Sequence, residues 1–164
     1  MTSLFHASIS TPLGAMTLAT DGRAIQSLEF DEPMPVAREL PSTVAAFAGD
    51  VQRALDAYFE RTLRTFDLPL APAGTPFQQA VWKALCAIPY GETVSYAEIA
   101  RRVGAPSAMR AVGAANGRNP IPIVIPCHRV IGADGRLVGY SAGLDRKRAL
   151  LALEAPLPLE QAAA

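Results

Sequence analysis

The sequence has little cysteine, no excess of either charge and no long hydrophobic run. Two cysteines, Cys86 and Cys127, are too few for a secreted disulfide scaffold and favour a cytoplasmic location. Fifteen Lys and Arg residues balance fifteen Asp and Glu residues, and this balance, taken whole, argues against a nucleic-acid partner. No stretch approaches the roughly 20 apolar residues of a membrane span, and the first residues lack the pattern of a signal peptide. We therefore expect neither membrane insertion nor export.

The sequence does contain enough apolar residues for a core, together with an uneven distribution of charge. Of its 164 residues, 50% are hydrophobic. At this length roughly 70% of the unfolded surface is expected to be buried, in one domain or in two small ones. Residues 1–100 hold six basic and eleven acidic side chains, whereas residues 101–164 hold nine basic and four acidic ones. This division indicates either a surface for a polyanion or a solvated basic face.

The first seventy residues combine strand patterns with a single helix. Residues 4–30 predict a three-stranded meander, with one turn at residues 11–14 and a two-residue hairpin turn at Asp21-Gly22. A helix capped by Ser42 or Thr43 follows, and its predicted buried face comprises Val44, Phe47, Val51, Leu55 and Phe59. Residues 65–70 suggest another strand, and residues 71–74 a linker. We predict an N-terminal αβ domain over residues 1–72.

The remaining residues predict a mainly helical domain over residues 73–155 and a tail over residues 156–164. Thr75 and Pro76 are typical of a helix start, and the apolar spacing carries this helix to Ile88. A capping box at residues 95–98 begins a short helix, and Ser107 is predicted to cap the next one, which ends near Asn116. These two helices form a helix-turn-helix pattern. Prolines predict that residues 121–125 are extended, and a last helix is predicted over residues 145–153.

Cys127 is the candidate nucleophile, because His128 and Arg129 follow it directly and Pro126 precedes it. A neighbouring base or cation lowers the pKa of a thiol and so makes the thiolate available. Cys86 lies in an apolar helical pattern and is interpreted as a small core residue without a role. The two cysteines and two histidines lack the paired spacing of zinc ligands, so we expect no metal site and no cofactor.

The helix predicted after Ser107 carries small side chains, and Arg110 is its one long charged residue before Arg118. Such a smooth surface allows a close approach, either to another helix in the core or to a narrow groove of DNA. In the second case the arginine enters the base stack. The spacing alone does not separate these two interpretations.

Taken together, the motifs resemble the O6-alkylguanine-DNA alkyltransferases, also called methylated-DNA-protein-cysteine methyltransferases. The resemblance covers residues 77–154 and rests on Ser95-Tyr96, Arg110-Ala111-Val112-Gly113, Asn119-Pro120, Pro126-Cys127-His128-Arg129-Val130 and Gly139-Tyr140. It implies an α+β fold, with a small ribonuclease-H-like αβ N-terminal domain followed by a winged-helix-like, mainly α C-terminal domain. It also implies direct-reversal repair: an alkylated guanine is rotated out of double-stranded DNA, and the cysteine irreversibly accepts its O6-alkyl group.

The resemblance further implies a role for each site residue. Cys127 is the acceptor, His128 activates it through a water molecule, and Glu154 orients His128. Tyr96 contacts the phosphate backbone and donates to the departing base, while Asn119 is the hinge between the recognition helix and the cysteine segment. The residues implied in minor-groove binding are Ser107, Arg110, Ala111 and Gly113. Those implied in the substrate pocket are Val130, Tyr140 and Ser141. We expect a monomer in the absence of DNA.

One position departs from the family pattern, because Ala142 stands where a glycine is usual, and its methyl group is expected to restrict the pocket loop. The residues themselves leave two other functions open. A winged-helix DNA-binding module explains the basic half and the helix-turn-helix, but not the Pro126-Cys127-His128 motif. A cysteine hydrolase explains the thiol, but not Arg110 on its small-residue helix.

Overall fold

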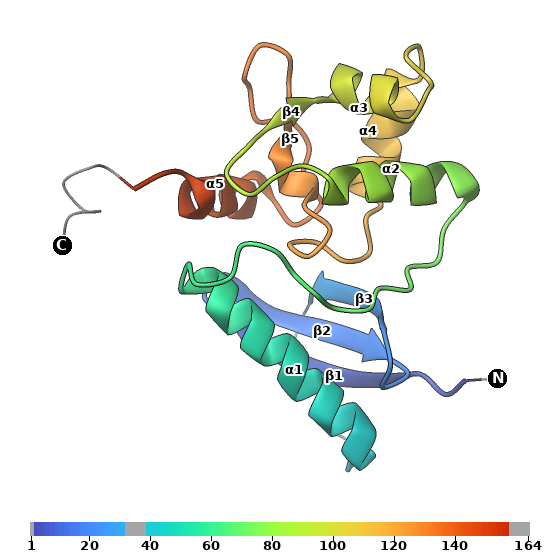
Figure 1. The fold of residues 1–164 in the computed structure, drawn as a ribbon, viewed down its shortest axis with the longest axis vertical. Helices are drawn as coiled ribbons and strands as arrows, with labels where there is room; N and C mark the ends of the chain where they lie inside the picture. The colour runs from blue at the N-terminus through green and yellow to red at the C-terminus, as the bar shows by residue number, and fades with distance from the viewer. Residues whose placement is uncertain (1, 32–38, 158–164) are drawn as a thin grey trace.

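The computed structural model describes residues 2–31 and 39–157, which form a small antiparallel sheet with one long helix and, beside it, a group of shorter helices (Figure 1). The sheet has the order β1-β2-β3, with β1 at Phe5–Thr11, β2 at Gly14–Thr20 and β3 at Ile25–Phe30. Helix α1, Ser42–Phe59, lies across one face of this sheet. The predicted meander and the α+β class are confirmed.

The connection between β2 and β3 is longer than the predicted two-residue turn. The ladder shifts register between Ala19 and Thr20, and the chain turns through residues 21–24. The Asp21 carboxylate accepts hydrogen bonds from the N–H groups of Arg23 and Ala24 at 2.8 and 3.0 Å. The prediction was wrong because Asp21 caps a wider loop with its side chain, whereas a type I′ turn would require a positive φ at this residue.

Helix α1 uses neither of its predicted caps, since Pro41 is the N-cap residue and no side chain caps the first turn. Its buried residues are Val44, Phe47, Val51, Leu55 and Tyr58. Four of these were predicted, but Phe59 is half-buried and its neighbour Tyr58 occupies the core. The apolar pattern does not identify Tyr58 as a core residue, because a buried hydroxyl needs a polar partner. That partner is Glu154, which lies 96 residues away in the sequence.

Residues 65–70 do not form the predicted strand. Their backbone makes one isolated bridge, between Leu70 and Ile25, where the Ile25 N–H donates to Pro69 O at 2.9 Å. Pro69 has no N–H of its own, so a regular ladder cannot continue through it. Residues 71–75 then lead, without helix or strand, to the second part of the chain.

Within residues 76–157 the chain forms four α-helices: α2 at Pro76–Cys86, α3 at Tyr96–Arg102, α4 at Met109–Gly117 and α5 at Leu144–Glu154. Helix α2 begins with a capping box between Thr75 and Gln78, as its sequence predicts, and ends two residues before the predicted Ile88. Ser95 caps α3 by accepting from Glu98 N at 3.1 Å. The box expected there is half formed, because the Glu98 carboxylate binds the arginines that follow it.

Ser107 does not cap α4. The helix begins at Met109 with Ala108 in the N-cap position, and no side chain caps it. The Ala108 N–H donates to Ala105 O at 2.9 Å, so the chain makes a separate turn before the helix starts. The helix-turn-helix of α3 and α4 therefore has a longer connection than predicted.

Residues 121–125 form a compact turn and not the predicted extended segment. Ile125 N donates to Ile121 O at 2.9 Å, and Ile123 has a φ of 72°. The Asn119 side chain closes this turn, because its amide donates to Ile125 O at 2.7 Å and its carbonyl accepts from Ile121 N at 2.9 Å. The prolines do prevent a helix. The backbone groups of an extended segment would need hydrogen bonds from a neighbouring strand, whereas here the Asn119 side chain supplies them and the segment forms a turn.

The turn leads into a single 3₁₀ turn, η1 at Cys127–Arg129, and then into β5 at Val130–Ile131. Strand β5 pairs in parallel with β4 at Val94–Ser95, so the segment before α3 and the segment after η1 are joined. The sheet and the helices share one continuous apolar cluster, and Leu28 N donates to Pro120 O across the junction. In the described ranges no helix is long and apolar enough to cross a membrane. Residues 158–164 of the predicted tail lie outside the described residues.

Candidate active site

Cys127 lies where the residue 119–126 turn ends, at the first position of η1. The residue is 2% exposed and belongs to the continuous core. Its N–H donates to Ile125 O at 2.8 Å, and its carbonyl accepts from Asn116 Nδ2 of α4 at 3.5 Å. The turn and α4 therefore fix the backbone of the cysteine from two sides.

Burial raises the pKa of the Cys127 thiol to about 11, although the Asn119 side chain and the charge of Lys147 act in the opposite direction. The expected lowering of this pKa by the adjacent His128 and Arg129 is wrong for the free protein. The thiol of the free protein is therefore protonated near pH 7. A base has to take the thiol proton as the reaction occurs.

Glu154, at the end of α5, gathers hydrogen bonds from three buried side chains. His128 Nε2 lies 2.8 Å from Oε1, and the Tyr58 hydroxyl donates to the same oxygen at 2.7 Å. Arg129 donates from Nη2 to Oε1 at 2.8 Å and from Nε to Oε2 at 2.9 Å. Burial by itself raises the pKa of this carboxyl group, but the hydrogen bonds from His128 and Arg129 outweigh it and hold the pKa at about 2.

His128 is fully buried, and burial lowers its pKa against the opposing effect of Glu154. The ring is therefore neutral near pH 7. Because Nε2 faces an ionised carboxylate, we assign the ring proton to Nε2, which leaves the lone pair on Nδ1. Nδ1 is buried and has no hydrogen-bond partner among the described residues. The residue next to the thiol thus has a nitrogen free to accept a proton.

Lys147 is a site residue that the sequence analysis missed. It is fully buried in α5, and its ammonium group donates to the carbonyls of Val130, Val138 and Gly139 at 2.6, 3.1 and 3.3 Å. These bonds hold the loop that follows β5, and the positive charge acts on Cys127. Its spacing from Leu150 and Glu154, three and seven residues along one helix face, is the signal that could have identified it.

Of the predicted pocket residues, Tyr140 and Ser141 lie in the loop of residues 132–143, and Val130 lies just before it in β5. Tyr96, at the start of α3, donates its hydroxyl to Val138 O at 2.9 Å. Burial and the neighbouring Cys127 raise the pKa of Tyr140, which agrees with a position beside the sulfur. Val130 is fully buried, whereas Ser141 is exposed and lines a cavity of about 220 Å³.

Arg146 ties this pocket loop to the N-terminal sheet. Its guanidinium donates to Ala142 O at 3.1 Å and to Leu13 O at 3.0 Å, and it lies 4.2 Å from the centre of the Phe30 ring. Ala142 does not have a positive φ, so its methyl group causes no backbone strain. The loop is therefore restrained at this residue by Arg146, and the restriction expected from the methyl group stays a prediction.

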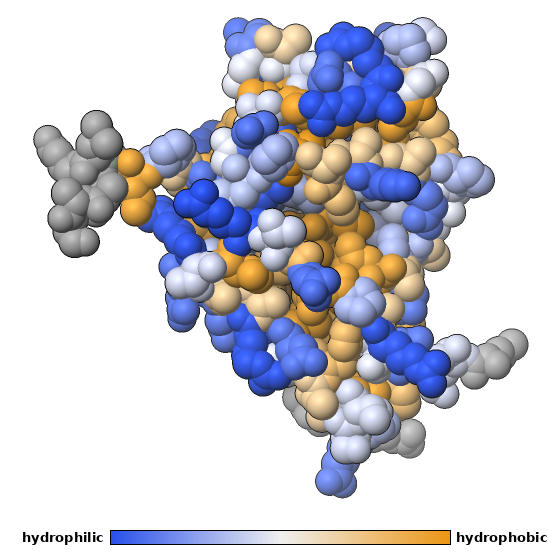
Figure 2. All heavy atoms as spheres, viewed as in Figure 1, coloured by the Kyte–Doolittle hydropathy of each residue, from blue (hydrophilic) through white to orange (hydrophobic). Residues whose placement is uncertain are grey.

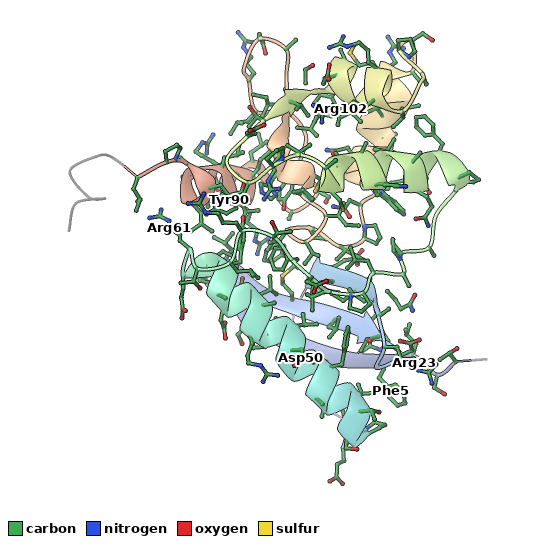
Figure 3. The ribbon with its side chains drawn as sticks, in the orientation of Figure 1. Phe5, Arg23, Asp50, Arg61, Tyr90 and Arg102 are labelled. Atoms are coloured by element: carbon green, nitrogen blue, oxygen red, sulfur yellow. The ribbon has the colours of Figure 1, made fainter. Side chains whose placement is uncertain are left out.

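A second cavity, of about 350 Å³, brings together Tyr96, Arg110 and Gly113 between α3, α4 and the pocket loop. Arg110 is exposed at its edge. Ser107 and Ala111 are exposed but do not line this cavity. Figure 2 shows strongly hydrophilic residues gathered over α3, where Arg102 lies (Figure 3).

Cys86 is exposed and is not the core residue that its surroundings predict. It follows the buried Leu85 and so lies about 100° around the helix from that side chain. It lines a cleft of about 280 Å³ together with Arg64 and Phe66. Among the described residues, no three His, Cys, Asp or Glu side chains are grouped as metal ligands.

Comparison with known proteins gives the same assignment for both parts of the chain. Residues 4–72 match the family described as 6-O-methylguanine DNA methyltransferase, ribonuclease-like domain, and residues 76–156 match 6-O-methylguanine DNA methyltransferase, DNA binding domain. A methylated-DNA--protein-cysteine methyltransferase of Mycobacterium tuberculosis is 52% identical over 153 residues, which cover 92% of each chain. One from Methanosarcina barkeri is 50% identical and covers 92% of this chain and 97% of the relative. The crystal structure of Mycobacterium tuberculosis OGT in complex with DNA aligns with a TM-score of 0.80 and 51% identity, covering 92% of this chain and 94% of that one.

Proposed function

Because the chain belongs to the O6-methylguanine-DNA methyltransferase family, we propose that it repairs DNA by direct reversal, moving the alkyl group of O6-alkylguanine irreversibly to Cys127. One observation carries the proposal: the buried thiol is followed by a neutral imidazole whose Nε2 is held by an ionised carboxylate. This arrangement supplies a nucleophile, a base and an orienting group, as in a hydrolase triad. The product is a thioether, which water does not cleave, so each molecule reacts once.

In the proposed step, Cys127 Sγ attacks the alkyl carbon and the bond from that carbon to O6 breaks. The thiol proton passes through a water molecule to His128 Nδ1, and Glu154 stabilises the resulting imidazolium. The electron pair of the broken bond leaves with the guanine, which takes up a proton as it is released. Tyr96 donates a hydrogen bond to the base as this charge develops, so its hydroxyl has to leave Val138 O when substrate enters. The step needs no metal and no cofactor.

The proposed partner is double-stranded DNA, bound through its minor groove along α4. The exposed Arg110 and the small residues around it allow the helix to approach closely, and the arginine fills the place of the rotated guanine. Ser107, Ala111 and Gly113 contact the groove beside it. The relative from Mycobacterium tuberculosis in complex with DNA supports this choice of partner. We further propose that the free protein is a monomer and that it acts in the cytoplasm.

Val130, Tyr140 and Ser141 line the proposed pocket for the flipped base. Asn119 is the proposed hinge, and its contacts support a fixed connection: both ends of its amide close the turn that joins α4 to Cys127. A helix placed in the groove then sets the position of the sulfur relative to the base.

The test is mass spectrometry of the protein after incubation with a duplex oligonucleotide that contains O6-methylguanine. We expect one stable methyl adduct per molecule, located at Cys127. Cys127→Ser should abolish transfer and leave DNA binding largely intact, because an alcohol at neutral pH lacks the nucleophilicity of a thiol. The matched control is Cys86→Ser, which changes the exposed cysteine of α2 and should keep the full stoichiometry.

The same experiment separates the two other functions. A DNA-binding module would bind the duplex without any adduct, and a cysteine hydrolase would turn over an acyl substrate without retaining a methyl group. An adduct at Cys86, or transfer by the serine variant at position 127, would also contradict the proposal.

A further inference from the structure

The Glu154 carboxylate receives one of its donors from the N-terminal part of the chain. Tyr58, in the last turn of α1, donates to Oε1 at 2.7 Å. The same oxygen lies 2.8 Å from His128 Nε2 and 2.8 Å from Arg129 Nη2. Helix α1 belongs to the part that matches the ribonuclease-like domain. Both parts of the chain therefore supply hydrogen-bond donors to the same carboxylate oxygen.

Tyr58 is held rigidly and remains a proton donor. The residue is 0% exposed, and its ring centre lies 5.3 Å from that of Phe66 and 6.1 Å from that of Tyr90. Burial and the charge of Glu154 raise the pKa of its hydroxyl far above the usual value, so the group stays protonated throughout the neutral range. A fixed donor with one charged acceptor defines where that acceptor atom lies.

Two neighbouring contacts hold the backbone of α5 at the same place. Arg61 Nε donates to Leu153 O at 3.1 Å, and the Tyr90 hydroxyl donates to the same carbonyl at 3.3 Å. Figure 3 shows Arg61 and Tyr90 where the end of α1 meets α5. These two residues position the helix backbone, whereas Tyr58 reaches the carboxylate itself.

We propose that Tyr58 is a positioning residue for alkyl transfer, acting through Glu154 on His128; this inference rests on the function proposed above. Three donors converge on Oε1, so each limits the directions open to the other two. Without the Tyr58 hydroxyl, Arg129 alone sets where the carboxylate lies relative to the His128 ring, because its guanidinium bonds both carboxylate oxygens. His128 Nε2 keeps its acceptor, but the direction of that hydrogen bond, and with it the position of the ring that carries Nδ1, is less well defined. The N-terminal part thus contributes to the chemistry without touching the substrate.

The loss of this hydrogen bond also changes when His128 is protonated. Three charged groups act directly on His128: Glu154 and Lys147 of α5 and Arg129 of η1. Two further groups act through these, because Tyr58 donates to Glu154 and Cys86 of α2 interacts with Arg129. The Tyr58 donor withdraws charge from the carboxylate, so its removal makes the carboxylate favour the protonated imidazole more strongly and the pKa of His128 rises. A protonated His128 cannot accept the thiol proton. The transfer rate falls at low pH, where His128 becomes protonated, and we call this part of the pH–rate profile the acid limb. The acid limb therefore moves to higher pH.

The test compares wild type, Tyr58→Phe and Tyr90→Phe in single-turnover transfer from a duplex that contains O6-methylguanine, at saturating DNA and over a range of pH. Tyr58→Phe keeps the ring and removes the donor to Glu154. We expect its plateau rate to fall about tenfold, the lower end of the effect of losing a hydrogen bond to a charged group, and its acid limb to move to higher pH. Tyr90→Phe removes a neighbouring hydroxyl that bonds a backbone carbonyl, and should change the rate by less than about twofold.

A purely structural role for Tyr58 would lower stability but leave the rate of the folded protein and its acid limb at the wild-type values, and this result would overturn the proposal. Absence of transfer by the wild type would instead overturn the function on which it rests. Should Tyr58→Phe fail to fold, 3-fluorotyrosine introduced at this one site supplies a stronger donor of nearly the same shape. We then expect the acid limb to move to lower pH, and an unchanged limb would contradict the proposal.

Discussion

Replacing Glu154 with glutamine is expected to lower the free energy of unfolding by about 3 kcal/mol at pH 7. The carboxyl pKa is about 2 in the folded protein. In an unfolded chain it is about 4.3, and roughly two pKa units at about 1.4 kcal/mol each give this value. Breaking a buried ion pair such as that of Arg129 with Glu154 costs a similar amount, about 3–5 kcal/mol. For a chain of this length the melting temperature should fall by about 6–12 °C.

The pH dependence of the Glu154→Gln effect follows from the same pKa difference. The folded pKa lies below the unfolded one, so the carboxylate stabilises the protein fully above about pH 5 and progressively less as the pH falls toward about 2. The difference between wild type and variant should therefore shrink by about half by pH 3. Denaturant titrations monitored by circular dichroism at several pH values measure this difference directly.

The matched control is Glu98→Gln, which removes a carboxylate that also binds two arginines but lies on the surface of α3. This variant should unfold close to wild type, because solvent screens exposed pairs. The reasoning is refuted if Glu154→Gln unfolds with the wild-type free energy. It is also refuted if the difference from wild type is the same at pH 7 and pH 3.

Three further predictions concern DNA binding and the pocket. Arg110→Ala should slow repair of duplex DNA more than reaction with free O6-methylguanine, because the free base has no stack to hold open; equal losses in the two rate assays would place the arginine elsewhere. Affinity for duplex DNA should fall as salt is added. A plot of log affinity against log salt concentration should have a slope of about −0.9 per phosphate contact, a few units in total. An affinity that does not change with salt would contradict the prediction that the basic half faces DNA. Lys147→Met should slow transfer about tenfold and lower stability by about 1–3 kcal/mol, measured by single-turnover kinetics and denaturation, because one carbonyl of β5 and two of the pocket loop lose their donor.

The parts of the fold that could be predicted depend on local patterns. Thr75 and Pro76 identify the start of α2 because a cap and a first-turn proline satisfy neighbouring backbone groups. The meander follows from alternation and turn residues within thirty positions. The division at residue 72 stays a prediction, as do the roles given to the site residues.

The parts that could not be predicted depend on contacts between distant residues. Asn119 folds residues 121–125 into a turn through its side chain, which no propensity describes. Lys147 and Tyr58 are buried because each finds polar partners supplied by another element. A sequence identifies the thiol and the imidazole next to it, but the groups that hold them come from elsewhere in the chain.

The position of Glu154 after every other site residue has a consequence for biosynthesis. A chain grows from its N-terminus, so α1 and the cysteine segment exist before the helix that carries this carboxylate. Until that helix docks, Tyr58 and Arg129 lack their acceptor and His128 lacks the group that orients it. If His128 and Glu154 have the roles proposed above, nascent chains and fragments that stop short of residue 154 hold a thiol that is not activated. On that mechanism, a protein that reacts only once does not become reactive until its C-terminal helix is in place.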